Sequence, residues 1–313
     1  MTTAFSPADS TRRGASMIVF PALLALITAA ALYAPRLDIG AALGLARDPN
    51  QPLTFVVVLA ILYALIASAE RLLPYRPEWN RAQGDQRTDV GHLLLNGLVT
   101  SRVASAVAYA IGLAGSIWLA ERVGLRLWPS HWPMAAQLLL ALVVAEFGHY
   151  WFHRISHERA LVWRVHAPHH SAPRLYWLNA TRFHPLDLFG LIVCQIVPLV
   201  LLGADAPALL AYGLFSGAYG QLQHGNIDVR SGPLRYLFST PEVHRWHHST
   251  DTREGNNNYG AVLSGWDLLF GTFFYPRDRR FSGPVGIGDM PNYPTGLLAQ
   301  LVAPFRAAGG APR

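Results

Sequence analysis

Long apolar stretches, broken only rarely by a charged residue, dominate the first half of the chain. A helix needs about 20 apolar residues to cross the roughly 30 Å hydrocarbon layer of a membrane. Four stretches approach or exceed that length, and we predict one membrane span in each: 17–34, 52–69, 93–120 and 132–147. Backbone polar groups find no water in lipid, so the spans should be helices and the fold class all-α, a polytopic membrane bundle.

Two shorter apolar stretches follow in the second half, at 188–203 and 207–222. Only three residues separate them, which favours a tight helical hairpin that enters the membrane. We therefore expect three regions, namely N-terminal transmembrane helices with about three spans, a domain that contains the membrane hairpin 188–222, and a C-terminal tail: 1–130, 131–275 and 276–313. The last residues of the tail are expected to be disordered.

Composition favours a membrane protein over a soluble globule. Hydrophobic residues make up 51% of the chain and charged residues only 14%, whereas an ordinary soluble domain is about 25% charged. The single cysteine, Cys194, excludes an intramolecular disulfide and with it the disulfide-rich secreted folds. The net charge of +6 would suit a nucleic-acid partner, but the basic residues are all arginines that fall singly between apolar runs. We therefore expect no nucleic-acid partner.

The arginines are shared unevenly between alternate loops, and this predicts an orientation. Cytoplasmic loops carry the excess of basic residues. Arginines collect before the first predicted span, after the second and after the fourth, while each intervening loop holds only two. We expect a multi-pass protein with both termini, and everything from His149 to Arg182, in the cytoplasm. The first apolar stretch is longer than the 7–15 residues of an export-signal core, so we interpret it as a span.

Nine of the thirteen histidines fall in three short clusters. The clusters read HYWFHRISH from His149, HAPHH from His166 and HRWHH from His244. Spacings of three and four residues bring side chains onto one face of a helix, about one turn apart. Imidazoles packed together without a metal would leave donors and acceptors unmatched, or charges repelling. The pattern therefore predicts metal binding.

The number of histidines indicates more than one metal ion. A single zinc takes four ligands, and eight or more histidines exceed that number. Nitrogen ligands suit iron, zinc or copper. Tyr150 stands where the helical motif of a zinc protease has glutamate, which argues against a hydrolase.

From Glu146 to Phe274 the chain resembles the sterol desaturase and fatty acid hydroxylase superfamily of membrane di-iron oxygenases. The resemblance rests on the ordered segments YWFHRISHE, VWRVHAPHHS, PEVHRWHHS, NNNYG and GWDLLFGTFF. It implies a cytoplasmic site for two iron ions, which zinc can replace in purified protein, and O2 as a co-substrate. It also implies a set of metal ligands: His153, His157, His166, His169, His170, His224, His244, His247 and His248.

Other polar residues near the boxes are candidates for supporting roles. His184 resembles a histidine of the sterol-oxidising branches, and we expect either a tenth ligand or a pocket residue. Ligating imidazoles usually donate their second nitrogen to a carboxylate or carbonyl. We expect this support behind the ligands from His149 and from four carboxylates: Glu146, Asp187, Asp228 and Glu242. His92 and His131 lie outside the matched region, and we expect structural roles for them.

The resemblance implies an O2-dependent enzyme that hydroxylates or desaturates an unactivated C–H position of a lipid. The chain shows no glycine-rich dinucleotide motif and no cysteine pattern for a cluster or haem, so a separate electron donor is expected. The family expectation is ferredoxin, or a cytochrome with an NAD(P)H reductase. Sterol, fatty acyl, ether lipid and carotenoid substrates all stay open. A membrane zinc hydrolase and a non-catalytic metal-binding membrane protein are the alternatives.

Overall fold

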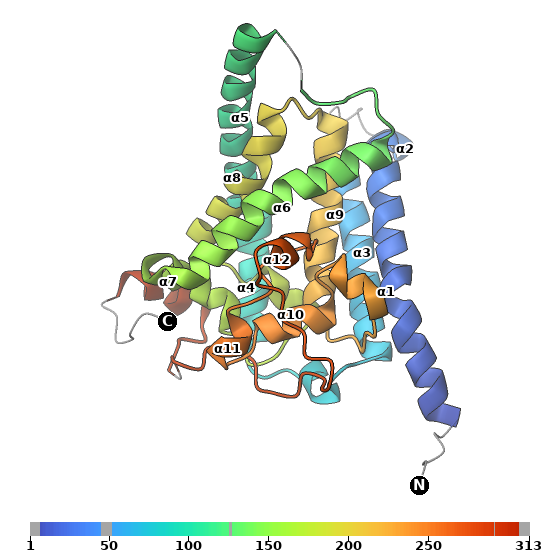
Figure 1. The fold of residues 1–313 in the computed structure, drawn as a ribbon, viewed down its shortest axis with the longest axis vertical. Helices are drawn as coiled ribbons and strands as arrows, with labels where there is room; N and C mark the ends of the chain where they lie inside the picture. The colour runs from blue at the N-terminus through green and yellow to red at the C-terminus, as the bar shows by residue number, and fades with distance from the viewer. Residues whose placement is uncertain (1–6, 45–51, 125–126, 291, 307–313) are drawn as a thin grey trace.

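The computed structural model describes residues 7–44, 52–124, 127–290 and 292–306 (Figure 1). Within these ranges the chain forms helices, turns and isolated β-bridges but no β-strand, which confirms the all-α prediction. The α-helices are α1 Pro7–Tyr33, α2 Ile39–Ala42, α3 Pro52–Leu72, α4 Gln86–Leu95, α5 Ser101–Val123, α6 Met134–Glu158, α7 Ala160–His170, α8 Pro185–Leu201, α9 Ala206–His224, α10 Pro241–His247, α11 Thr252–Gly255, α12 Gly265–Leu269 and α13 Leu297–Val302.

Four helical segments are long and apolar enough to cross a membrane: Ser10–Arg36, Pro52–Leu72, Gln86–Arg122 and Met134–Glu158. The third joins α4 and α5 through a π-helical turn, Asn96–Thr100. The fourth differs from the sequence prediction, which ended a span at residue 147. Helix α6 continues to Glu158, because the first histidine cluster keeps helical spacing and simply extends the apolar helix.

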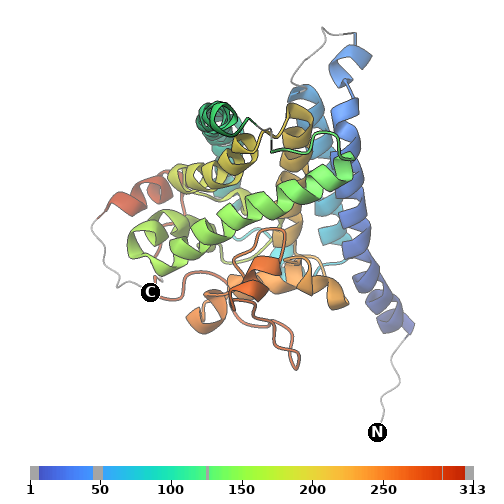
Figure 2. The same cartoon turned by 45° about the horizontal axis from the view of Figure 1, so that its top comes forward.

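Two helices, α8 and α9, occupy the stretches expected to form a tight hairpin, but they pack mainly against other helices and not along each other. Helix α8 packs along α5 and α6, while α9 lies against α1 and α3 (Figures 1 and 2). Glycine allows the closest approach. A Cβ on Gly148 of α6 would lie 2.0 Å from the carbonyl oxygen of Cys194 in α8, so these two backbones meet as small-residue membrane helices do.

The outer face of the bundle is apolar. On α5, Ile111 and Trp118 are more than half exposed, whereas Ala104 and Ala108 of the same helix are buried. Large apolar side chains on the outside and small ones inside suit a helix surrounded by lipid. The second and third histidine clusters lie on α7 and α10. These helices gather with α11 at one end of the bundle, the lower end in Figure 1.

The region after residue 275 packs onto that same end. Phe281 and Val285 are buried against Trp79 and Trp246. The residues of the tail that were expected to be disordered include 307–313, which lie outside the described residues.

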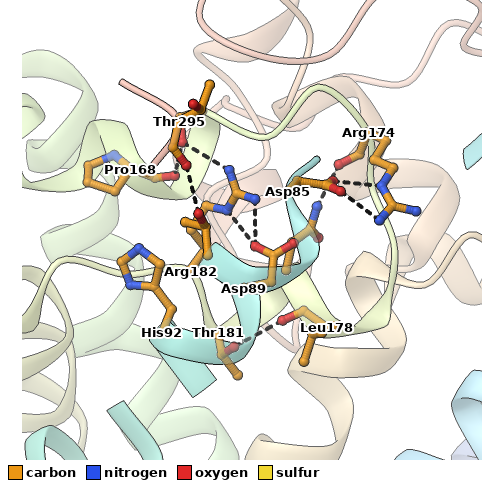
Figure 3. Close-up of polar contacts among 12 residues, drawn as sticks. Asp85, Asp89, His92, Pro168, Arg174, Leu178, Thr181, Arg182 and Thr295 are labelled. Carbon is orange, nitrogen blue, oxygen red and sulfur yellow. Dashed lines mark hydrogen bonds and ion pairs between the residues drawn. The ribbon is translucent and has the colours of Figure 1, made fainter. Parts of the chain in front are cut away.

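Two buried ion pairs tie α4 to the segment between α7 and α8 (Figure 3). Arg174 pairs with Asp85 at 2.7 Å, and Arg182 pairs with Asp89 at 2.6 Å. All four side chains are almost fully buried. Removing one partner of such a pair leaves an uncompensated charge in the interior, so the pairs hold this segment in place.

Candidate metal centre

The ligand atoms of nine histidines gather into two buried groups. Within each group the candidate ligand atoms lie within 4.8 Å of one another, and no carboxylate or thiol of the described residues joins either group. We call the first group site one: His153, His157, His166, His170 and His247. We call the second group site two: His169, His224, His244 and His248. These are the nine histidines for which the family resemblance implied a ligand role.

Four elements from distant parts of the chain supply these rings. His153 and His157 lie one turn apart on α6, and the second cluster occupies the last turn of α7. The third cluster lies on the short helix α10, which begins at Pro241 in the first-turn position that tolerates proline. His224 ends α9. The two sites adjoin, since the ring of His170 stacks on that of His248 with centroids 4.3 Å apart.

Hydrogen bonds to oxygen set the protonation of the site one rings. His153 Nδ1 lies 2.7 Å from the carbonyl oxygen of Tyr259, and His247 Nδ1 lies 2.7 Å from that of Asn257. A carbonyl oxygen only accepts, so Nδ1 carries the proton in both rings and Nε2 keeps its lone pair. His166 Nδ1 similarly lies 2.9 Å from Asp187 Oδ2. This is the tautomer of a histidine that binds metal through Nε2.

In site two, one ring has a comparable hydrogen bond to oxygen at Nδ1. His224 Nδ1 lies 3.1 Å from Asn179 Oδ1, which leaves Nε2 of this ring toward the other histidines. His244 Nε2 lies 3.0 Å from His224 Nε2 and 3.0 Å from His248 Nε2. Three ring nitrogens at this spacing bring lone pairs face to face, and a shared cation would satisfy them.

The donor set fits a metal. His153 Nε2 is buried and has no hydrogen-bond partner, and the same is true of His169 Nδ1. Buried polar atoms in native proteins almost always have partners, so an orphaned lone pair within a ring of imidazoles fits a bound cation. An all-nitrogen set matches iron, zinc or copper and not magnesium or calcium, which prefer oxygen.

Burial keeps the extramembrane rings neutral. Burial and the nearby His248 ring lower the pKa of His170 well below 6.5, and burial with the nearby His224 ring does the same to the pKa of His169. The pKa values of His244 and His248 are likewise lowered well below 6.5, first by burial and then by neighbouring imidazoles. Neutral imidazole is the form that binds metal, so protons compete little for these nitrogens.

The structure does not bring His184 to either site. His184 caps α8, where its Nδ1 accepts a hydrogen bond from Leu186 N at 3.2 Å, and its Nε2 lies 3.1 Å from Leu301 O. Both ring nitrogens are therefore used, which leaves none to ligate. His92, hydrogen-bonded to Gln300 at 2.9 Å, and the exposed His131 also lie outside both sites.

His149 lies beside site one without joining it. Its ring centroid is 5.4 Å from that of His153. Gln195 of α8 donates to His149 Nδ1 at 2.7 Å, so the proton of this ring is on Nε2, opposite to the ligand rings. His149 thus lies next to a candidate ligand ring, and a supporting role for it stays a prediction.

Of the four carboxylates considered as orienting groups, only Asp187 contacts a histidine. Glu146 instead accepts from the backbone N–H groups of Val262 and Leu263. Asp228 pairs with Arg280 and Arg12, and Glu242 accepts from Ser231 and Tyr275. These three carboxylates hold loops around the centre.

Sequence reasoning missed most of the groups that orient the ligands. The carbonyl oxygens of Asn257 and Tyr259, the Asn256 side chain 3.1 Å from His157 Nδ1, and Asn179 perform this role. The NNNYG segment, one of the segments that carry the family resemblance, was the available sequence signal for these contacts. A backbone carbonyl leaves no residue-type signature, so its role could not be read from sequence.

Comparisons with known proteins agree with this geometry. Residues 138–272 match the fatty acid hydroxylase family. The chain is 40% identical over 295 residues to the ornithine lipid hydroxylase OlsE of Rhizobium tropici, an alignment that covers 94% of this chain and 85% of that protein. No solved structure matches the chain significantly.

Two further relatives are more distant. The alkylglycerol monooxygenase of Danio rerio is 29% identical over 211 residues, covering 64% of this chain and 46% of that protein. Methylsterol monooxygenase 1 of Rattus norvegicus is 26% identical over 139 residues, covering 44% of this chain and 46% of that protein. The chain thus spans less than half the length of these two relatives. All three are hydroxylases or monooxygenases, which confirms the expectation of an oxygen-dependent oxidoreductase. With its histidines gathered as the sequence resemblance implied, the chain belongs to the fatty acid hydroxylase family, within the sterol desaturase and fatty acid hydroxylase superfamily.

Proposed function

We propose that this protein is a di-iron membrane oxygenase that hydroxylates a lipid, with one iron in site one and one in site two. The observation that carries the proposal is the pair of adjoining all-histidine groups at one end of a bundle of membrane-type helices. The relative with 40% identity is named an ornithine lipid hydroxylase, and we take an ornithine-type lipid as the substrate.

Iron held in such imidazole sets supplies reductive activation of dioxygen and attack on an unactivated C–H bond. Overall, one C–H bond, O2, two electrons and two protons give an alcohol and one molecule of water. The electrons come from a separate donor, for which we propose ferredoxin or a cytochrome with an NAD(P)H reductase.

The residues of this chain position the reaction and exclude water from it. Tyr259, Asn257 and Asp187 keep the Nδ1 protons of three ligands away from the centre, so that their Nε2 atoms stay available. The ring of Phe183 stacks on His169 with centroids 4.2 Å apart and covers one side of site two. A dry, low-dielectric centre suits the chemistry because it excludes competing reactions with water.

We propose that the metal centre faces the cytoplasm. Arginines collect in the loops on the side of the second and third histidine clusters, and the bias of basic residues toward cytoplasmic loops supports this side. A lipid can reach this end of the bundle from the bilayer, while the soluble donor approaches from the water.

The test is turnover of ornithine lipid by the purified full chain in nanodiscs, with isotope-labelled O2 and a chemical or protein reductant. We expect about two irons per chain and one labelled oxygen atom in the lipid. Incorporation of oxygen from labelled water without O2, by protein that holds zinc, would overturn the proposal in favour of a hydrolase. An exposed histidine serves as control: His131→Asn should retain both iron and turnover.

A further inference from the structure

A small cavity opens at the end of α3, separate from the two metal sites but close to site two. It holds about 150 Å³. Its walls include Glu70 and Arg71 from the last turn of α3, Gln86 from the start of α4, and Arg174, Tyr176 and Trp177 from the segment after α7. None of these residues belongs to site one or site two.

Glu70 places a carboxylate without a cation in the wall of this cavity. The side chain is only 4% exposed. Its Oε2 accepts hydrogen bonds from Trp177 N and Asn226 N, each at 2.9 Å. Both donors are backbone N–H groups, so they do not supply a positive charge to this carboxyl group. Among the described residues no arginine lies within ion-pair distance of Glu70, and none donates a hydrogen bond to Oε1.

The nearest buried arginine is already occupied. Arg174 holds both carboxylate oxygens of Asp85, at 2.7 and 2.9 Å (Figure 3). Its third nitrogen donates to Trp79 O. Its three nitrogens therefore donate to other groups, and it forms no hydrogen bond or ion pair with Glu70. A buried carboxylate that the protein leaves without a cation is a site for a cation from outside.

A positive charge, that of Arg71, lies next to Glu70 in the sequence and also lines the cavity. Arg71 is exposed and forms no ion pair within the described part of the chain. The cavity thus offers a buried negative group and an exposed positive group on neighbouring residues. This arrangement is complementary to a zwitterion that enters with its ammonium first and keeps its carboxylate at the surface.

The cavity adjoins the metal centre through one wall. The segment that lines it, from Arg174 to Leu178, continues directly into Asn179, whose side chain lies 3.1 Å from His224 Nδ1 in site two. Asn179 also donates to Arg174 O at 2.5 Å, so the same side chain contacts both the cavity wall and a histidine of site two. A headgroup in this cavity would therefore be held at the side of site two.

We propose that this cavity is the headgroup subsite of the enzyme, and that it selects lipids whose amino-acid headgroup carries an ammonium for Glu70 and a carboxylate for Arg71. The inference rests on the proposed function, because it takes the lipid of that reaction as its ligand. It adds Glu70 as the residue that distinguishes a lipid with an ammonium group from one without it.

The test compares two lipids that differ in one group. N-acyl ornithine carries the terminal ammonium, and N-acyl norvaline has the same carbon skeleton without it. Their binding to the full-length, metal-loaded chain is measured calorimetrically in phosphatidylcholine nanodiscs without O2, so that no turnover occurs. We expect the wild type to prefer the ornithine probe by roughly ten- to a hundredfold, as for a hydrogen bond between charged groups.

Three variants separate recognition from folding. Glu70→Gln keeps an oxygen for the Trp177 and Asn226 N–H groups but loses the charge, and we expect it to bind both probes equally. Glu78→Gln removes an exposed carboxylate from the next loop, outside the cavity, and should keep the wild-type preference. Arg71→Gln should weaken both probes to the same degree, since both carry the carboxylate. Unchanged metal content and circular dichroism verify that each variant is folded.

The proposal is overturned if Glu70→Gln keeps the wild-type preference, or if the wild type shows none. Either result would leave the proposed oxygenase function intact, because turnover of ornithine lipid is measured separately. A wild type that prefers the ornithine probe and yet inserts no oxygen would instead refute the proposed function and retain the subsite.

Discussion

Among the residues that the structure describes, Asp187 is the one carboxylate that hydrogen-bonds to a candidate ligand, and its removal should loosen one metal ion of two. Its Oδ2 lies 2.9 Å from His166 Nδ1, and its Oδ1 is buried without a hydrogen-bond partner. In Asp187→Ala the His166 ring loses its acceptor, so its proton is free to move to the nitrogen that faces the metal. Loss of such a supporting contact weakens metal affinity by roughly 10- to 100-fold, or about 1.4–2.7 kcal/mol.

The contrast with Asp187→Asn isolates the cause. Asparagine keeps an oxygen acceptor of the same size but not the charge, and a neutral hydrogen bond is about half as strong as a charge-assisted one. We therefore expect Asp187→Asn to recover a large part of the affinity that alanine loses. Site two has no contact with Asp187, so its ion should be held as in the wild type.

The assay is metal release from purified protein against increasing chelator, followed by elemental analysis. Wild type should release both ions at high chelator, whereas Asp187→Ala should release one ion at roughly 10- to 100-fold lower chelator and keep the other. Circular dichroism provides the control for folding. If both ions shift together, or if neither shifts, then Asp187 does not set the His166 tautomer as the geometry indicates.

Other predictions concern ligands and buried charges. His169→Ala should lower metal content and abolish turnover, whereas His131→Ala should do neither, and equal losses in both would contradict the ligand assignment. His184→Ala should retain all bound metal and lose about 1 kcal/mol of stability through its helix cap, as measured by chemical unfolding; a drop in metal content would make it a ligand after all. Arg174→Ala should destabilise the protein by about 3–5 kcal/mol in thermal unfolding because it strands buried Asp85. The double variant with Asp85→Ala should recover part of that loss, and no recovery would show that the pair is not coupled.

The candidate ligands could be predicted because the spacing of the histidines is visible in the sequence. His153 and His157 stand four residues apart, and the second and third clusters repeat one pattern of histidines, so helical geometry and family resemblance pointed to the same rings. Helices α8 and α9 could be predicted for a similar reason, since two apolar runs flank three linking residues, but their separate packing partners could not. Both predictions rest on local periodicity, which sequence displays directly.

The supporting contacts could not be predicted, because they join residues that are far apart. Asn179 and His224 are 45 positions apart, and Arg174 and Asp85 are 89 apart. Any of several asparagines or aspartates could have met these partners, and only the packing of α4, α7 and α9 selects one. For Glu146 the prediction relied too much on proximity in the sequence. This carboxylate is close to the first cluster along the chain, but it accepts hydrogen bonds from the backbone of residues 262 and 263.

Two imidazoles of site one take their orientation from the main chain, which changes how the centre responds to substitution. Replacing the side chain of residue 257 or 259 leaves the peptide oxygen that His247 or His153 uses. The vulnerable point is instead Asn258, with a left-handed φ of 58° and an amide that bonds the backbone of Phe274 through both its oxygen and its nitrogen. One short loop, whose backbone is held by the Asn258 amide and by the Asp267 carboxylate, thus governs how two rings are presented to the centre.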